Sequence, residues 1–213
     1  MSTYYYLSQL FLRLVLWALF GLRVKGRENI PRRGGVIIAA NHISLADPPF
    51  IGSVCRREAH YLAKEELFRR KAFAALIRAY RAFPLKRDGV DREAIGRAIK
   101  LLRSGHALLL FPEGSRQKGG ELGPGRPGVG LIATKTGVPV VPAFIQSSDH
   151  LGQAILRKRR LRITFGQPLK AKKGDYKEFA RQIMERIREL KNLHEERGCP
   201  FRRQLLAHKA KFK

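Results

Sequence analysis

The chain has 213 residues, a length that suits one domain with its own hydrophobic core and is too short for two ordinary domains and a linker. Its 43 Lys and Arg against 17 Asp and Glu give a formal net charge of +26, which indicates an anionic partner such as nucleic acid, anionic lipid or a phosphorylated small molecule. Cys55 and Cys199 form no CxxC pair, so the sequence indicates neither a disulfide framework nor a zinc site, and a reducing compartment is the default.

The N-terminal segment, residues 4–22, is almost entirely apolar. Its length is near the ~20 residues of a membrane-spanning helix, but Arg13 at its middle would cost roughly 2.5–3.5 kcal/mol in the bilayer centre. Gln9 and Arg13 share one helical face, and the tyrosines and Trp17 prefer the membrane interface. We therefore predict that residues 1–22 form a membrane-anchoring helix that lies in one leaflet. A spanning helix ranks second, and a buried core helix and a cleaved signal peptide rank below it.

The rest of the chain alternates short apolar runs with segments of helical composition. Strands are predicted at residues 35–40, 59–63, 82–85, 107–111, 138–145 and 161–165, and helices at 48–55, 71–80, 91–103, 127–136 and 176–195. Pro139 and Pro142 indicate an edge or irregular position for the strand at 138–145. The alternation predicts one α/β domain over residues 23–196, with a mixed, largely parallel sheet flanked by helices, and a basic tail over 197–213.

The run NHISLAD, residues 41–47, follows the first buried strand, where α/β folds place ligand sites. His42 and Asp47 are five residues apart, so they meet only if the chain turns between them. Pro48 favours such a turn, because it excludes Asp47 from the α region and suits the first position of a helix. Asp47 would then cap the helix with one oxygen and orient the His42 ring with the other. A helix cap beside an unrelated histidine is the open alternative.

The run FPEGSR, residues 111–116, follows a second buried strand. Glu113 and Arg116 do not suit a core without partners, and the planar fork of Arg116 suits a phosphate. Gly114 allows backbone amides to approach an anion, and Ser115 is predicted to donate a hydrogen bond, because no G-x-S-x-G elbow surrounds it. A plain polar loop is the alternative. A base, its orienting carboxylate and an anion clamp are the groups that move an acyl group onto a hydroxyl of a phosphorylated molecule.

With these two blocks in order, the sequence resembles the lysophosphatidic acid acyltransferase family, the 1-acylglycerol-3-phosphate O-acyltransferases of phospholipid biosynthesis. Residues 41–47 resemble its N-H-x4-D motif, and residues 111–116 resemble its F-P-E-G-[TS]-R motif. The run AFPLKR at 82–87 resembles the intervening block, which gives an arginine to the acceptor's phosphate. The run VPVVP at 138–142 resembles the fourth block, which lines the acyl site. Four motifs in order make the resemblance specific.

The resemblance implies a role for each matched residue. His42 would take the proton from the sn-2 hydroxyl of lysophosphatidic acid, which attacks the thioester of acyl-CoA or acyl carrier protein directly, and Asp47 would orient His42. Phosphatidic acid would be the product, and no cofactor, metal or covalent acyl-enzyme is implied. The residues implied to bind the acceptor, with the arginines on its phosphate, are Arg87, Glu113, Gly114 and Arg116.

The chain departs from the family pattern at residues 125–128, where GRPG stands in place of F-K-x-G. Arg126 keeps the positive charge of the lysine, but the loss of the aromatic residue leaves other lysolipids and glycerol 3-phosphate open as acceptors. A thioesterase is a further alternative. A basic nucleic-acid-binding module is more remote: the run RKRR at 157–160 favours it, but no helix-turn-helix or RNA-recognition signature accompanies that run, so no nucleic acid is expected. We predict a monotopic or peripheral enzyme on the anionic cytoplasmic face of the cytoplasmic membrane.

Overall fold

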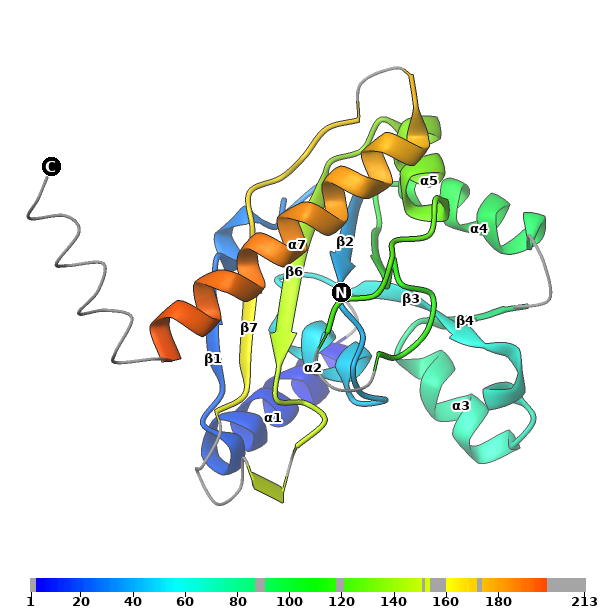
Figure 1. Ribbon diagram of the computed structural model, residues 1–213. Coiled ribbons are helices and arrows are strands. Elements are labelled where there is room, and N and C mark those ends of the chain that lie inside the picture. Colours follow the sequence, from blue (N-terminus) through cyan, green and yellow to red (C-terminus); the bar gives the residue numbers. More distant parts are fainter. Residues whose placement is uncertain are drawn as a thin grey trace, which may run out of the picture.

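The computed structural model describes residues 3–86, 91–117, 121–150, 152–153, 160–171 and 174–198. Its centre is a seven-stranded sheet in the order β1-β7-β6-β2-β5-β3-β4 (Figure 1). The strands are β1 (Arg23–Lys25), β2 (Val36–Ala40), β3 (Ala59–Lys64), β4 (Ala82–Leu85), β5 (Ala107–Leu110), β6 (Val140–Gln146) and β7 (Arg162–Phe165). Neighbouring strands are parallel except β6 and β7, which are antiparallel. The mixed, largely parallel sheet predicted from the sequence is therefore confirmed.

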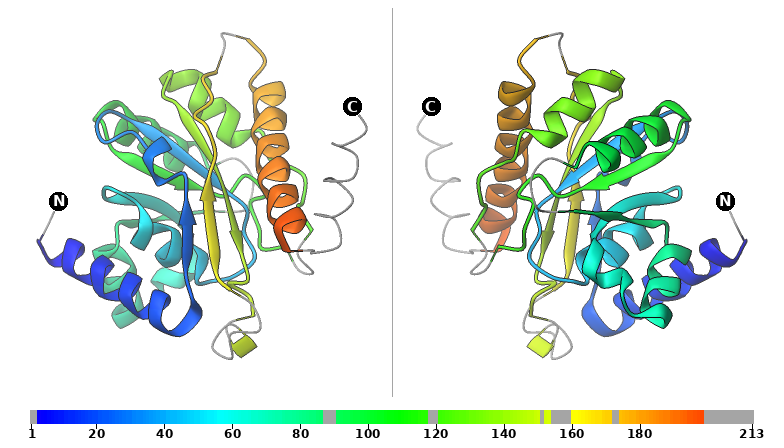
Figure 2. Two further views of the ribbon diagram at one scale, coloured as in Figure 1. Left: turned by 90° about the vertical axis from the view of Figure 1, so that its left-hand side faces the viewer. Right: turned by 90° about the vertical axis from the view of Figure 1, so that its right-hand side faces the viewer.

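Helices cover both faces of the sheet (Figure 2). One face carries α4 (Arg92–Arg103), α5 (Gly128–Thr136) and α7 (Tyr176–Gly198), and the other carries α1 (Thr3–Phe20) and α2 (Asp47–Val54). The helix α3 (Lys71–Ala79) and the short 3-10 helices η1 (Arg27–Asn29) and η2 (Glu65–Phe68) complete the domain. The central strand β2 is buried along its whole length, as expected for a parallel strand between two helical layers.

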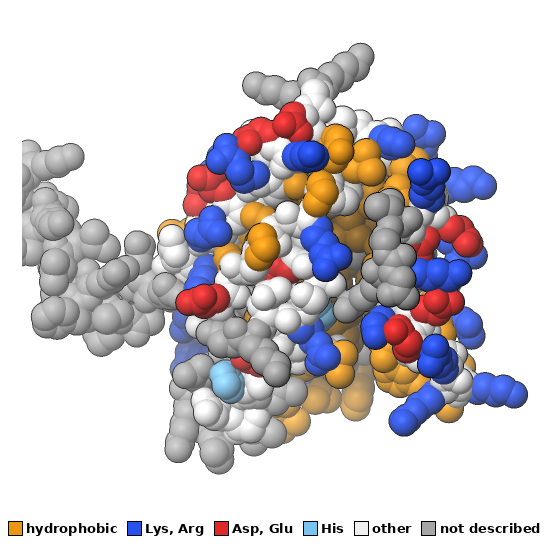
Figure 3. Space-filling view, turned by 45° about the vertical axis from the view of Figure 1, so that its right-hand side comes forward, with side chains coloured by type: hydrophobic (Ala, Val, Ile, Leu, Met, Phe, Trp, Pro, Cys, Tyr) orange, Lys and Arg blue, Asp and Glu red, His pale blue; other side chains and the backbone are white. Residues whose placement is uncertain are grey.

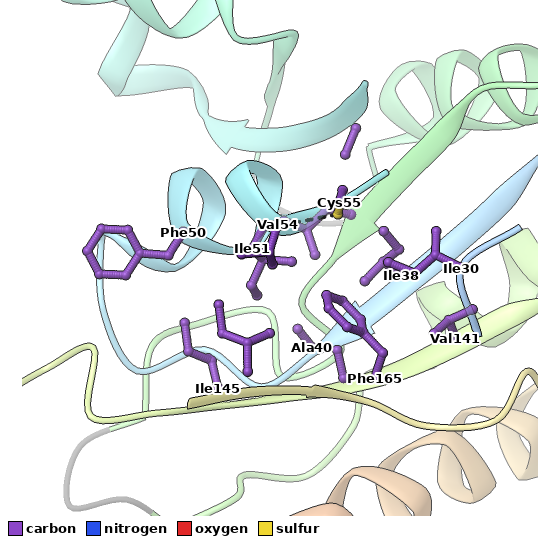
Figure 4. Close-up of a cluster of buried hydrophobic side chains, with 14 of the residues drawn as sticks. Ile30, Ile38, Ala40, Phe50, Ile51, Val54, Cys55, Val141, Ile145 and Phe165 are labelled. Carbon is purple, nitrogen blue, oxygen red and sulfur yellow. Dashed lines mark hydrogen bonds between the residues drawn. The ribbon is translucent and has the colours of Figure 1, made fainter. Parts of the chain in front are cut away.

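The pleat of β2 divides its side chains between two cores. Ile37 and Ala39 face the layer of α4, α5 and α7, while Val36, Ile38 and Ala40 face α1 and α2. In the second core, the apolar side chains of α2 lie over β2 and β6, as Figure 4 shows. Each fully buried aliphatic side chain contributes roughly 1.5–3 kcal/mol, so this packing fixes α2 firmly on the sheet.

The strand β6 lies inside the sheet, so the prediction of an edge position for residues 138–145 was wrong. It pairs with β2 on one side and with β7 on the other. The carbonyl of Pro142 accepts a hydrogen bond from Gly166 N at 2.7 Å, which shows that this residue presents its backbone to the β7 side. The β7 strand ends at Phe165, so the missing N–H of Pro142 falls where that ladder stops. Proline is tolerated there because it removes no bond to β2.

The helix α1 packs against α2 with Tyr5, Gln9 and Leu16 buried, and it turns other large apolar side chains outward. Gln9 is buried, and its Nε2 donates to Gly52 O of α2 at 2.6 Å. Phe11 and Trp17 are 70% and 68% exposed. An ordinary surface helix turns apolar side chains to the core and polar ones to water, whereas α1 carries large apolar side chains on its exposed side as well. Within the described part of the chain, no helix combines the length and the hydrophobicity required to cross a membrane.

The strand β3 carries a half-buried histidine whose protonation opposes folding. Nδ1 of His60 is buried and has no partner among the described residues, and the His106 ring centroid is 5.1 Å away. Burial lowers the pKa of His60, and so do His106 and Arg81, while the Ala107 backbone and Glu58 offset part of the shift. Because the folded-state pKa lies below the unfolded value of about 6.5, this histidine supports stability above that pH and loses the contribution as the pH falls below it.

We therefore expect the free energy of unfolding to decline between about pH 7 and pH 5, and to decline less in a His60→Gln variant, which has no imidazole to protonate. Urea unfolding at a series of pH values measures this slope. His150→Gln is the matched control, since His150 is exposed and lies after β6. A His60→Gln slope equal to the wild-type slope would show that His60 does not govern the acid sensitivity.

Candidate active site

Three polar segments meet at one edge of the sheet. The parallel strands β2, β5 and β6 end there, because the carboxyl ends of parallel strands lie at the same edge. Residues 41–47 follow β2, residues 111–117 follow β5, and residues 147–148 follow β6. This edge therefore collects side chains that are far apart in the sequence.

The structure brings His42 and Asp47 into contact. His42 Nδ1 lies 2.8 Å from Asp47 Oδ2 in a buried pair. The same oxygen accepts the backbone N–H groups of Ile43 at 2.7 Å and Ser44 at 2.8 Å. These bonds close the turn that leads into α2, which begins at Asp47 with Pro48 next. The chain thus turns between the two residues, as their contact requires, and one carboxylate oxygen holds both the ring and the turn.

The second oxygen of Asp47 has a partner that the sequence did not reveal. Asp47 Oδ1 accepts a hydrogen bond from the hydroxyl of Ser148, and both residues are almost completely buried. Asp47 therefore does not cap α2: the N-cap residue is Ala46, and no side-chain cap bond forms. With hydrogen bonds to both oxygens the carboxylate has a fixed orientation. The signal in the sequence was a pair of serines directly after a buried strand.

Asn41 fixes the point at which β2 ends. Its Nδ2 donates to Ile145 O at 3.0 Å, and its Oδ1 accepts from Ile145 N at 2.7 Å. The side-chain amide thus makes the pair of hydrogen bonds with β6 that the backbone of another β2 residue would otherwise make. This replacement frees the backbone of the next residue, His42, to leave the sheet at a defined position.

Glu113 braces the backbone of the histidine rather than its ring. Oε2 accepts from His42 N at 2.7 Å, and Oε1 accepts from Gly123 N at 3.0 Å. Burial raises the pKa of Glu113, and the hydrogen bonds from the amides of His42 and Gly123 offset part of that rise. In this structure both oxygens are used by backbone amides. The contact of Glu113 with the acceptor stays a prediction.

The ring of His42 is held on one face as well as at one edge. Phe111 stacks on it, with ring centroids 4.1 Å apart and planes 21° apart. A carboxylate on Nδ1 selects the tautomer that has its proton there, so Nε2 carries the lone pair. Nε2 has no hydrogen-bond partner among the residues that the structure describes, and His42 lines a cavity. The arrangement can therefore accept a proton from a bound hydroxyl.

The cavity beside His42 has a volume of about 700 Å³ and a mostly apolar lining. Leu62 of β3 and Phe73, Leu76 and Ile77 of α3 contribute to its wall. Figure 3 shows hydrophobic side chains in the hollow of this face and Lys and Arg side chains on both of its sides. A cavity of this size and character suits a long apolar chain whose reactive end lies at His42.

The remaining predicted residues lie at different places. Arg116 and Gly114 line the cavity with His42. Gly114 has φ +69°, and a Cβ there would lie 2.5 Å from Nε of Arg126, so glycine allows the Arg126 side chain to cross the loop. Ser115 Oγ accepts from Gln117 Nε2 at 3.3 Å.

Arg87 lies outside the described residues. Among the described residues, the structure brings together His42, Asp47, Glu113, Gly114, Arg116 and Arg126.

Comparisons with known proteins agree with this geometry. A family model described as acyltransferase matches residues 21–146, which include both motif blocks. A 1-acyl-sn-glycerol-3-phosphate acyltransferase of Bacillus subtilis is 31% identical over 159 residues, which are 74% of this chain and 78% of the relative. A chloroplastic 1-acyl-sn-glycerol-3-phosphate acyltransferase of Brassica napus is 26% identical over 81% of this chain, which spans only 52% of that relative.

A solved structure of an acyltransferase has a fold similar to that of this chain. The crystal structure of the 1-acyl-sn-glycerophosphate acyltransferase from Thermotoga maritima is 29% identical, with a TM-score of 0.67 over 84% of this chain and 76% of that one. The family match covers more than half of the chain and contains the buried histidine–aspartate pair. The chain therefore belongs to the acyltransferase family and is an enzyme of that family.

Proposed function

We propose that this enzyme transfers a fatty acyl group from acyl-CoA or acyl carrier protein to the sn-2 hydroxyl of 1-acylglycerol 3-phosphate, giving phosphatidic acid for phospholipid biosynthesis. The observation that carries the proposal is the buried His42–Asp47 pair, 2.8 Å apart, beside an apolar cavity whose wall also contains Arg116. The names of the relatives from Bacillus subtilis and Thermotoga maritima support the choice of acceptor.

The proposed reaction uses His42 as a base and then as an acid. Nε2 takes the proton of the acceptor hydroxyl while its oxygen attacks the thioester carbonyl carbon. The new carbon–oxygen bond forms, the carbon–sulfur bond breaks, and the imidazolium returns the proton to the leaving thiolate. Asp47 stabilises the transient positive charge on the ring, and the apolar cavity holds the acyl chain. No covalent acyl-enzyme is required.

The test offers a labelled acyl thioester together with lysophosphatidic acid, other lysolipids and glycerol 3-phosphate, and identifies the products by mass spectrometry. We expect labelled phosphatidic acid to form fastest. Preference for another lysolipid would correct the acceptor while keeping the reaction. Release of free fatty acid with every acceptor would contradict acyl transfer and would indicate a thioesterase.

Arg116 is proposed to bind the acceptor's phosphate, because it lies in the same cavity wall as His42. A charge-assisted bond to phosphate contributes roughly 1.5–3 kcal/mol, so Arg116→Ala should raise the acceptor KM about ten-fold or more and change the donor KM less. Steady-state kinetics with each substrate varied in turn measure this. Arg97→Ala on α4, on the opposite face of the sheet, is the matched control. An effect of Arg116→Ala on the donor KM alone would contradict the assignment.

The proposal also includes a membrane location, with α1 in the interface and the enzyme monotopic or peripheral on the cytoplasmic face of the cytoplasmic membrane. The outward apolar face of α1 supports it, since Phe11 and Trp17 are largely exposed. The formal charge of +26 suits an anionic surface. Leu12 of the same helix lines the cavity, so a lipid substrate would reach His42 beside the membrane-facing helix.

Deletion of α1 would not test this location cleanly, because Tyr5 and Leu16 are buried and Leu12 lines the cavity. The sharper variant replaces Phe11 and Trp17 by Glu. Since each buried aromatic contributes roughly 1.5–3 kcal/mol, the double variant should partition onto vesicles at least ten-fold more weakly.

Activity on a short-chain acceptor dissolved in water should persist, since neither side chain lines the cavity. Leu193→Glu changes an exposed apolar residue of α7 on the opposite face and should bind vesicles like the wild type. Equal vesicle binding by the double variant and the wild type in a flotation assay would contradict the interfacial role of α1.

A further inference from the structure

We propose that Arg13, Arg27 and Arg56 form a binding site for the phosphate group of an anionic membrane lipid, at the junction of α1, η1 and α2. This site is separate from the one that performs acyl transfer, because none of the three arginines lines the cavity beside His42. The choice of a lipid as the source of the phosphate rests on the proposed membrane location of α1.

Arg27 supplies the first observation, an unused buried donor. Its Nη2 donates to Cys55 O at 3.3 Å, which holds the guanidinium against the end of α2. Its Nε is buried and has no hydrogen-bond partner among the described residues. A buried donor of a charged group is costly without an acceptor. The guanidinium is therefore anchored on one side and lacks a partner on another.

The second observation is the gathering of positive charge around Arg27. Arg56 follows Cys55 directly, and Arg13 lies one helical turn beyond Gln9, the residue of α1 that bonds α2. Both lie close enough to Arg27 to lower its pKa, after burial as the largest cause. None of these arginines takes part in an ion pair within the described ranges. Like charges gathered without a carboxylate favour binding of an anion.

Nearby acidic and phenolic groups do not remove this excess. Glu28, the neighbour of Arg27 in η1, is exposed and makes no ion pair with a described residue. Tyr6 of α1 is near enough to act electrostatically on the Arg27 guanidinium, and its hydroxyl is a further hydrogen-bond donor. Three guanidinium groups and a phenol form a donor set with the chemistry of a phosphate site.

The position of the site favours a lipid phosphate over a dissolved one. Arg13 of α1 is half-buried, whereas Phe11, Leu14 and Trp17 of the same helix are exposed. If that apolar face enters the acyl boundary, the arginines beside it lie near the depth of the headgroups. The inference gives a role to the cation in the middle of an apolar helix, since its charge would meet a phosphate instead of hydrocarbon.

The experiment measures binding of the full-length protein to vesicles of phosphatidylcholine alone and of phosphatidylcholine with an equal part of phosphatidylglycerol. Removal of one charge that merely faces an anionic surface weakens binding by about five-fold, whereas loss of a bidentate phosphate contact weakens it by about ten-fold or more. We expect Arg27→Gln and Arg56→Gln to lose ten-fold or more on the anionic vesicles. Arg33→Gln, which removes an exposed charge outside the cluster, should lose five-fold or less.

Two further variants and a soluble probe complete the test. Arg27→Lys keeps the charge and loses the fork, so it should bind nearly as weakly as Arg27→Gln if the site exists. Arg56 lies beyond the end of α2, is exposed, and makes no side-chain hydrogen bond to a described residue, so the Arg56→Gln variant is expected to fold normally. Melting curves of each variant check this. Inorganic phosphate, titrated in a thermal-shift assay, should stabilise the wild type weakly and Arg27→Gln not at all.

The outcomes separate this inference from the proposed function. Equal losses in Arg27→Gln, Arg56→Gln and Arg33→Gln, or full rescue by Arg27→Lys, would overturn the phosphate site. Strong stabilisation by inorganic phosphate that also blocks vesicle binding would overturn the assignment to a lipid. If the wild type bound no vesicles at all, the membrane location would fail, and the phosphate titration would still decide whether the arginines form an anion site.

Discussion

His42→Ala is expected to lower kcat by about 10²–10⁴-fold while the protein keeps its fold. The reason is the position of the ring: Nδ1 is held 2.8 Å from Asp47, Phe111 covers one face, and Nε2 is left for a substrate. Steady-state assays of purified protein measure the loss, and melting curves check the fold. His106→Ala is the matched control, because His106 lies at the amino end of β5, opposite the edge that carries the site.

Asp47→Asn should lose less activity than His42→Ala. An asparagine can keep its oxygen where Oδ2 accepts three N–H groups, and its amide nitrogen can then donate to the Ser148 hydroxyl, which is able to accept. The geometry survives and the charge that stabilises the imidazolium is lost. Full activity in His42→Ala, or a greater loss in Asp47→Asn than in His42→Ala, would contradict the roles given to the pair.

The main architecture was predictable because it depends on local patterns. Apolar runs of four to six residues marked β2 and β5, and the polar blocks directly after them marked the edge that carries the site. The turn between His42 and Asp47 followed from the proline after Asp47. The short strand β1, with the sequence RVK, was missed because its polar side chains gave no strand signal and it pairs only with the distant β7.

What the sequence could not predict are contacts that span the whole chain. Ser148 reaches Asp47 across 101 positions, and Asn41 reaches Ile145 across 104. The interior position of β6 depends on the order of strands, which no local pattern specifies. The inward direction of Gln9 likewise became visible only when α2 supplied its backbone acceptor. Long-range partners determine which face of an element is buried, whereas propensity and periodicity determine only that the element exists.

Glu113→Gln is expected to lower kcat by about 10²-fold with little change in the acceptor KM, because a displacement of about 1 Å in a catalytic group has an effect of that order. The two oxygens of Glu113 accept the backbone amides of His42 and Gly123. A glutamine can accept only one of them, and its NH₂ group must then face the other N–H, which cannot become an acceptor. At Asp47 the carboxylate-to-amide change is tolerated, because the Ser148 hydroxyl can accept a hydrogen bond as well as donate one. At Glu113 the same change is not tolerated, because a backbone N–H can only donate.

The same geometry predicts a loss of stability, since one buried N–H without an acceptor costs about 1–3 kcal/mol. Urea unfolding measures that cost, and the ratio of kcat to KM effects separates positioning from binding. Glu121→Gln is the matched control, because Glu121 is exposed and lies two residues before Gly123. A rise in the acceptor KM at unchanged kcat would show instead that Glu113 binds the acceptor, as its place in the FPEGSR block implies. A fall in kcat alone would show that Glu113 acts through the backbone of His42, which makes the amide of the catalytic residue itself a part of the site.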